Sequence, residues 1–99
     1  GPKKGWVGYS LDNTQYYFFL WNEESEVVVF QKCGDGVDPD KWKGDLGEIQ
    51  EEVGKWFTWT NKMDLKDRGF FLLSKDEQEC MLKAFFDESL AYAAETWGP

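Results

Sequence analysis

Six consecutive residues near the N-terminus, Tyr16–Trp21, are all aromatic or aliphatic, and no other feature constrains the fold so strongly. Successive side chains of a β-strand point to opposite faces of its sheet. Tyr17, Phe19 and Trp21 would therefore share one face, while the residues between them share the other. A sheet with one face in water shows polar residues at every second position, and this run shows none. We expect both faces of this strand to be covered, by helices of the same chain or by a partner.

The first third of the chain has the pattern of an antiparallel meander. Strands are predicted over Trp6–Ser10, Gln15–Trp21 and Glu26–Lys32, each rich in aromatic or β-branched residues. The turn-forming pair Asp12-Asn13 and the polar segment 22–25 separate them. Connections this short join antiparallel neighbours, because parallel strands need a long crossover.

The middle of the chain predicts a first helix. Asp38 is a suitable N-cap and Pro39 a suitable first helical residue. The apolar positions that follow are spaced by four, three, four and three residues, which is the spacing of one helical stripe: Trp42, Leu46, Ile49, Val53, Trp56 and Phe57. Three glycines interrupt this segment, so the helix could begin near Asp45 or end by Gly54. Residues 55–60 could instead form a strand.

A second helix is predicted at the C-terminal end, over Lys75–Thr96. Ser74 and Glu77 form a capping box, in which the serine hydroxyl and the glutamate satisfy each other's backbone amides. Acidic residues fill the first turns, where the helix dipole favours negative charge. Before it, residues 61–69 are interpreted as a charged loop and Phe70–Leu73 as a short strand.

These elements predict one α+β domain over residues 3–99. We expect a small antiparallel sheet, made of the three-stranded N-terminal meander plus one or two short strands, packed with two helices. A chain of 99 residues is long enough for one core. Gly1 and Pro2 are interpreted as the remnant of a cleaved expression tag.

The composition removes several kinds of catalytic site. The chain has 19 acidic residues, 11 basic residues and no histidine, for a net charge of −8. Imidazole bases, histidine-activated nucleophiles and histidine-ligated metals are therefore absent. The segment Gly34–Asp40 lacks the ligand spacing of a calcium loop and the Lys-Ser/Thr pair of a phosphate loop. We expect a non-enzymatic protein without a cofactor or a metal.

Two cysteines, Cys33 and Cys80, stand 47 residues apart with no metal-ligand spacing between them. We interpret them as reduced and packed, although a single disulfide stays open. This usage and the lack of a signal-peptide pattern favour a cytoplasmic location, and no apolar run is long enough to span a membrane.

Two sets of residues are candidates for partner binding. The first is an acidic face that we expect on the two helices: Glu48, Glu51, Glu52, Asp76, Glu77, Glu79, Asp87 and Glu88. The second is the aromatic strand face Tyr17, Phe19 and Trp21. Of the tryptophans, Trp42 and Trp56 are predicted to lie in the core.

No motif assigns the chain to a known family. Its short, acidic, tryptophan-rich character is typical of phage or mobile-element inhibitors and of toxin immunity proteins. We therefore expect an acidic inhibitor that acts as a nucleic-acid mimic, docks on a protein with a basic, nucleic-acid-handling surface, and binds no nucleic acid directly. Two alternatives stay open: an assembly module that dimerises through the aromatic face, and carbohydrate or ligand binding by exposed tryptophans.

Overall fold

The computed structural model describes residues 6–10, 16–21, 26–34, 36–54 and 56–98, and for 6–10 and 16–21 it describes the backbone alone. Five antiparallel strands form one sheet in the order β1-β2-β3-β5-β4. Their bounds are Trp6–Ser10, Tyr16–Trp21, Val27–Cys33, Glu48–Glu51 and Phe57–Asp64 for β1 to β5. The meander β1-β2-β3 has the expected antiparallel register, with Phe19 opposite Val29 and Val28 opposite Met63 of β5.

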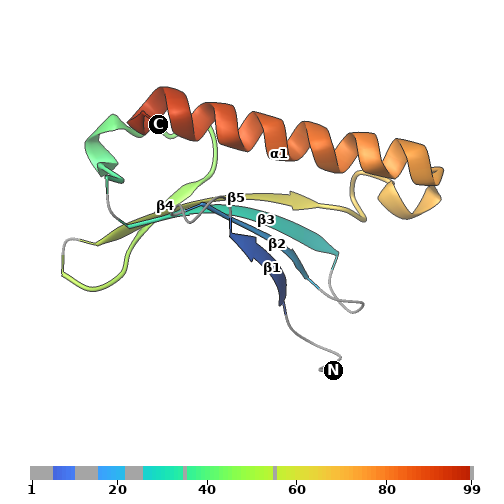
Figure 1. Cartoon of the computed structure of the whole chain (residues 1–99), viewed down its shortest axis with the longest axis horizontal. Helices are drawn as coiled ribbons and strands as arrows, with labels where there is room; N and C mark the ends of the chain where they lie inside the picture. The colour runs from blue at the N-terminus through green and yellow to red at the C-terminus, as the bar shows by residue number, and fades with distance from the viewer. Residues whose placement is uncertain (1–5, 11–15, 22–25, 35, 55, 99) are drawn as a thin grey trace.

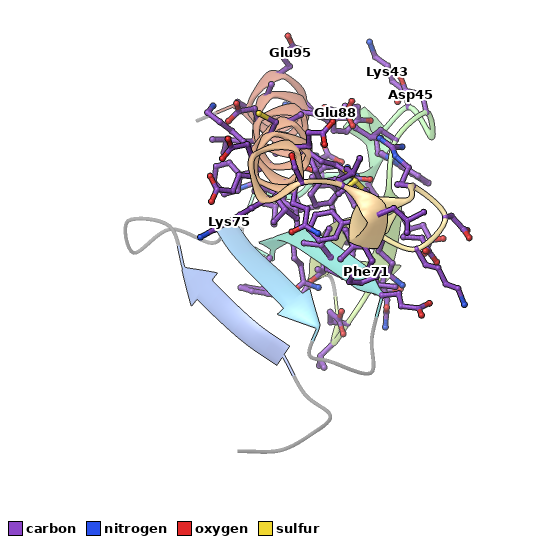
Figure 2. All side chains as sticks on the ribbon, turned by 90° about the vertical axis from the view of Figure 1, so that its right-hand side faces the viewer. Lys43, Asp45, Phe71, Lys75, Glu88 and Glu95 are labelled. Carbon is purple, nitrogen blue, oxygen red and sulfur yellow. The ribbon has the colours of Figure 1, made fainter. Side chains whose placement is uncertain are left out.

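One long helix, α1 (Lys75–Trp97), lies across one face of this sheet (Figure 1). Figure 2 looks nearly along the helix and shows β1 and β2 to one side of it. The core therefore forms between α1 and the β3-β5-β4 half of the sheet. Two short 3-10 helices, η1 (Pro39–Lys41) and η2 (Phe70–Leu72), lie in the connections on either side of β4 and β5.

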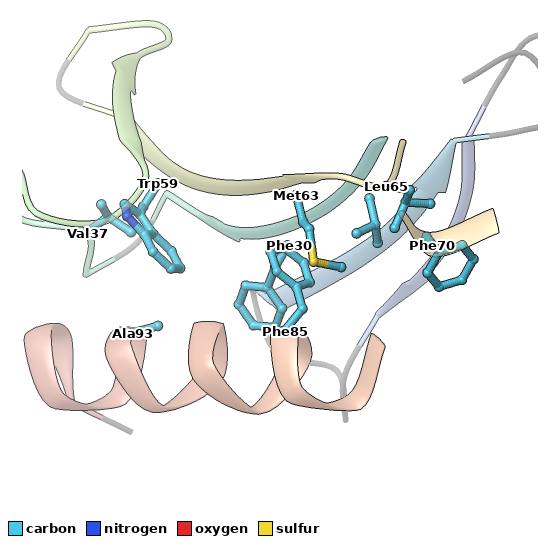
Figure 3. Packing of buried hydrophobic residues seen from close by; sticks show 9 residues of the cluster. Phe30, Val37, Trp59, Met63, Leu65, Phe70, Phe85 and Ala93 are labelled. Atoms are coloured by element: carbon cyan, nitrogen blue, oxygen red, sulfur yellow. The ribbon is translucent and has the colours of Figure 1, made fainter. Parts of the chain in front are cut away.

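The core is a row of apolar side chains between α1 and the sheet, seen along its length in Figure 3. Phe30 and Trp59 project from the sheet and are fully buried, with their ring centroids 6.2 Å apart. Trp59 stacks on Tyr92 at 5.1 Å, and Phe30 meets Phe86 edge-on at 5.6 Å. Because aromatic side chains bury a large area each, these few contacts supply much of the packing.

One buried polar contact joins the sheet to the helix. The Asn61 amide Nδ2 donates to Ser89 Oγ at 3.0 Å, and Ser89 Oγ donates to the Phe85 carbonyl at 2.8 Å. Ser89 is fully buried, so each of these groups would be costly to leave unpaired. The contact therefore fixes where along β5 the helix can sit.

The predicted C-terminal helix is confirmed together with its cap. Ser74 Oγ accepts from the Glu77 amide at 3.2 Å, and the Glu77 carboxylate accepts from the Ser74 amide at 3.0 Å. The helix begins at Lys75 as predicted and ends at Trp97, one residue later than predicted. Gly98 follows it with a φ of 82°, a conformation that glycine adopts readily.

The prediction of two helices is wrong, although the class is α+β. The middle segment forms η1, β4 and β5 in place of a helix. Of the apolar stripe that predicted the helix, Ile49 lies in β4 and Phe57 in β5, and the other four residues lie in the connections. Gly44, Gly47 and Gly54 adopt φ values of 77°, 74° and 64°, which end any helix that would run through them. Asp38 does cap Pro39, but the element that it caps is a single 3-10 turn.

Two shorter predictions are also wrong. The charged segment after Thr60 was expected to be a loop, yet its first four residues continue β5 to Asp64. Phe70–Leu73 was expected to be a strand, and it forms η2. The alternative for residues 55–60 is confirmed from Phe57 onward, since Trp59 faces the core while Thr58 and Thr60 face the other side.

Candidate functional site

The acidic residues of α1 form two rows along its exposed side. A helix has 3.6 residues per turn, so residues eleven apart lie close to the same side. Asp76 and Asp87 lie eleven residues apart, and Glu79, about one turn after Asp76, lies beside them; these three residues are here called the outer row. A second row, here called the groove row, contains Glu77, Glu88 and Glu95. All six are exposed, and with Lys75 and Lys83 they give the helix a net charge of −4.

Local contacts neutralise part of this charge. Lys83 forms an ion pair with Asp87 one turn away, and this hydrogen bond raises the pKa of Lys83. The backbone amide of Ser74, followed by its hydroxyl, holds the pKa of Glu77 below its ordinary value. Both lysine and glutamate are therefore charged at neutral pH. In the described part of the chain, Lys83–Asp87 is the one ion pair recorded on α1.

The other three predicted acidic residues are not on a helix, which corrects the expectation of one helical face. Glu48 and Glu51 lie in β4, and Glu52 follows it in the turn toward β5. All three are exposed. The predicted acidic residues therefore divide between the β4-β5 hairpin and α1, and the tip of this hairpin projects away from α1 in Figure 1.

The tip of the β4-β5 hairpin also exposes two apolar residues that were expected in a helical core stripe. Val53 is 85% exposed and Trp56 is 46% exposed. The Trp56 ring lies against Gly34, so a residue with a β-carbon at position 34 would overlap the ring. Tryptophan is enriched among the residues that dominate protein–protein binding. The alternation in residues 55–60 was the signal that could have placed Trp56 at an exposed position.

The aromatic candidates lie in β2, and their side chains fall outside what the structure describes. The backbone places Tyr17 opposite Gln31 and Ser10, and Phe19 opposite Val29 and Gly8. Trp21 is paired with Trp6 of β1. The prediction that this set binds a partner or a second copy therefore stays a prediction.

Tryptophan and tyrosine side chains hold the segment before β4 against α1. The indoles of Trp42 and Trp59 both donate to the Leu46 carbonyl, at 2.8 and 3.0 Å. The Tyr92 hydroxyl donates to Asp45 Oδ1 at 3.0 Å. Burial and this contact with Asp45 raise the pKa of Tyr92, so the hydroxyl keeps the proton that it donates. Trp42 is half-buried here, which agrees with its predicted place in the core.

A groove of 310 Å³ lies between α1 and the last part of β5, and sequence reasoning missed it. One wall is β5 over residues 61–64, and the other is α1 at Ala84 and Glu88. Leu46 lies at the end next to β4, and residues 67–68 follow the other end of the strand. Because this stretch was interpreted as a loop, nothing in the sequence pattern indicated a strand edge beside the helix.

Both cysteines are reduced thiols. Burial raises the pKa of Cys33, and the negative charge of Glu52 adds to the effect. A thiol that stays protonated is a weak nucleophile. Cys80 is exposed on α1, so the prediction that it is packed is wrong.

The described residues contain no cluster of three or more potential metal ligands of the cysteine, aspartate and glutamate type. None of their helices has the length and apolar character needed to cross a membrane.

We compared the chain with known protein families, with curated proteins and with solved structures, and none of the three comparisons found a match.

Proposed function

We propose that this chain is a non-enzymatic acidic binding protein, an inhibitor or immunity-type protein that docks on a basic, nucleic-acid-handling protein. The observation that carries the proposal is the exposed side of α1, where six carboxylates stand against two lysines on one rigid helix. Carboxylates fixed on a helix attract a basic surface and speed its association. The same charges repel phosphate, so the partner is a protein and the nucleic acid is its competitor.

The rest of the chain supports this function. The chain as a whole carries a net charge of −8, which adds long-range attraction toward a basic target. The exposed Trp56 and Val53 offer apolar contact area on a separate element. Two reduced thiols suit a reducing compartment, and we place the protein in the cytoplasm on that ground.

The test compares two variants of equal charge change. In the outer-row variant, Asp76→Asn, Glu79→Gln and Asp87→Asn neutralise three carboxylates of α1. The matched hairpin variant changes Glu48, Glu51 and Glu52 to glutamine. The partner is first captured from host extract on the unmodified chain, identified by mass spectrometry and purified.

The affinity of that partner for the chain is then measured at about 50 and 500 mM salt. The distance over which charges interact, the Debye length, falls several-fold across this range. We expect the outer-row variant to bind at least tenfold more weakly at low salt, while the hairpin variant loses less. We also expect the partner's nucleic acid to compete with the chain. An affinity that does not change with salt concentration would overturn the proposal. So would an equal loss of affinity in both variants.

A further inference from the structure

Strand β5 is longer than its outer neighbour. β4 pairs with Phe57–Thr60, with Glu48 opposite Thr60 at the last position. The next four residues, Asn61–Asp64, pair with β3 on one side. On their other side the structure records no neighbouring strand among the residues it describes. Figure 1 shows this part of β5 continuing beneath α1 beyond the end of β4.

The chain leaves this edge uncovered because of the residues just before β4. Gly47 has a φ of 74°, and a β-carbon there would overlap the Trp59 indole and the Thr60 carbonyl. The Trp59 indole then ties the Leu46 carbonyl to β5, and the Tyr92 bond to Asp45 ties the preceding residue to α1. The position that β4 would occupy beside residues 61–64 is therefore empty of described backbone.

This edge can accept another strand. A strand edge presents backbone N–H and C=O groups in alternation, and an extended peptide can add to it through main-chain hydrogen bonds. Four residues of strand give about 13 Å of edge. Asn61 and Met63 are buried on the side of α1, whereas Lys62 and Asp64 are exposed on the opposite side. An added strand would therefore alternate between the groove and the open face of the sheet.

The groove beside the edge selects the side chains of such a strand. Met63 and Phe85 make its apolar part, and Ala84 leaves room between them and solvent. Three carboxylates line the groove: Glu88 of the groove row, Asp64 and Asp67. They outnumber the neighbouring cations. The surroundings fit apolar residues that alternate with lysine or arginine.

We propose that the edge Asn61–Asp64 binds an extended segment of a partner protein, rich in alternating apolar and basic residues, as a sixth strand in line with β4. This inference deepens the proposed function and rests on it, since it gives the basic partner a backbone conformation. A second copy of this chain fits the edge less well, because two chains that each carry a net charge of −8 repel each other.

The experiment uses a fluorescein-labelled heptapeptide in which lysine and valine alternate. Its controls are two peptides of the same sequence, each N-methylated at alternate residues, so that one loses the amides facing β5. Binding is measured by fluorescence anisotropy with the full chain at about 50 mM salt, and backbone amide shifts are followed by NMR. We expect the parent peptide to shift the backbone amide resonances of residues 61–64. We expect one of the two methylated peptides to bind at least tenfold more weakly than the parent.

Two matched variants test the groove. Ala84→Trp fills it, whereas Ala94→Trp adds the same bulk at an exposed position that does not line it. We expect a tenfold or greater loss for Ala84→Trp and no change for Ala94→Trp, with circular dichroism confirming that both fold. The peptide experiment uses the unmodified chain, so it still tests the proposal if Ala84→Trp does not fold.

The outcomes separate the inference from the proposed function. If both methylated peptides bind like the parent, the contact is electrostatic, and strand addition is wrong while the acidic docking survives. If no peptide binds and the outer-row variant still weakens the captured partner, the edge is not the site. If sedimentation shows a dimer that Ala84→Trp abolishes, a second copy occupies the edge and the proposal is overturned.

Discussion

The two sides of α1 differ in what they contribute. Its inner side contains three buried residues, Phe85, Ser89 and Ala93, of which two are small. Larger side chains of α1 also pack, partly buried, against the same core: Met81, Leu82, Phe86, Leu90, Tyr92 and Trp97. Trp59 and Phe30 of the sheet are fully buried beneath the helix. Its outer side contains charged residues that touch little else. The inner side thus brings the helix close to the sheet, while the outer side presents charge.

This division separates stability from binding. Changes on the inner side should lower the free energy of unfolding, because they open cavities or leave buried polar groups unpaired. Changes on the outer side should leave folding nearly intact, because exposed ion pairs contribute little in water. The predictions below test whether the division holds at each position.

The largest effect is expected for Trp59→Ala. Trp59 is fully buried, stacks on Tyr92 and is one of two indoles that donate to the Leu46 carbonyl, so truncation leaves a cavity and removes one of these two hydrogen bonds. We expect the free energy of unfolding to fall by about 3–5 kcal/mol. Urea unfolding followed by circular dichroism measures it. Trp56→Ala, at a half-exposed position, is the control and should cost much less; equal losses would show that the core does not depend on Trp59.

A smaller loss is expected for Asn61→Ala, which removes the polar contact between sheet and helix. The change leaves Ser89 Oγ without its donor inside the core, at a cost of about 1–3 kcal/mol. A double-mutant cycle with Ser89→Ala isolates the contact. We expect a coupling of at least about 0.5 kcal/mol between the two sites. Additive losses would mean that the helix is positioned by apolar packing alone.

The helix cap should contribute less again. Ser74→Ala removes the hydroxyl that accepts from the Glu77 amide and should cost about 1 kcal/mol. The effect arises on the exposed side of the helix start and creates no cavity. Thermal unfolding at pH 7 measures it. Ser74→Asp restores a side-chain acceptor at the same place, and failure of that variant to recover the loss would remove capping as the cause.

Local signals in the sequence predicted the meander and the capped helix well. Period-two apolar runs and a capping box depend on neighbouring residues, and these act the same way in any fold. The middle segment failed because its apolar spacing matched a helix by coincidence. The left-handed conformations of Gly44, Gly47 and Gly54 interrupt the segment. At Gly47 the backbone also lies close against Trp59 and Thr60, a contact that the spacing of apolar residues does not report.

The candidate site was predicted in part for the same reason. The acidic residues of α1 follow from the helix, so their exposure could be foreseen. The groove could not, because it depends on where β4 stops, and that is set by Leu46 and Asp45 meeting side chains of β5 and α1. A sequence pattern reports which residues alternate, but not which strand edge stays uncovered.

The smallest effect concerns acid sensitivity at Glu77. Its pKa in the folded chain lies below the ordinary value of 4.5, chiefly because its carboxylate accepts from the Ser74 backbone amide. The charged form therefore stabilises the fold fully above pH 4.5, and this contribution is lost as the pH falls through the folded pKa. Glu77→Gln should flatten this part of the pH dependence, measured by urea unfolding between about pH 3 and 7. Ser74→Ala keeps the backbone amide, so it should keep most of the dependence; if it flattens the curve as much as Glu77→Gln does, the hydroxyl and not the amide lowers the pKa.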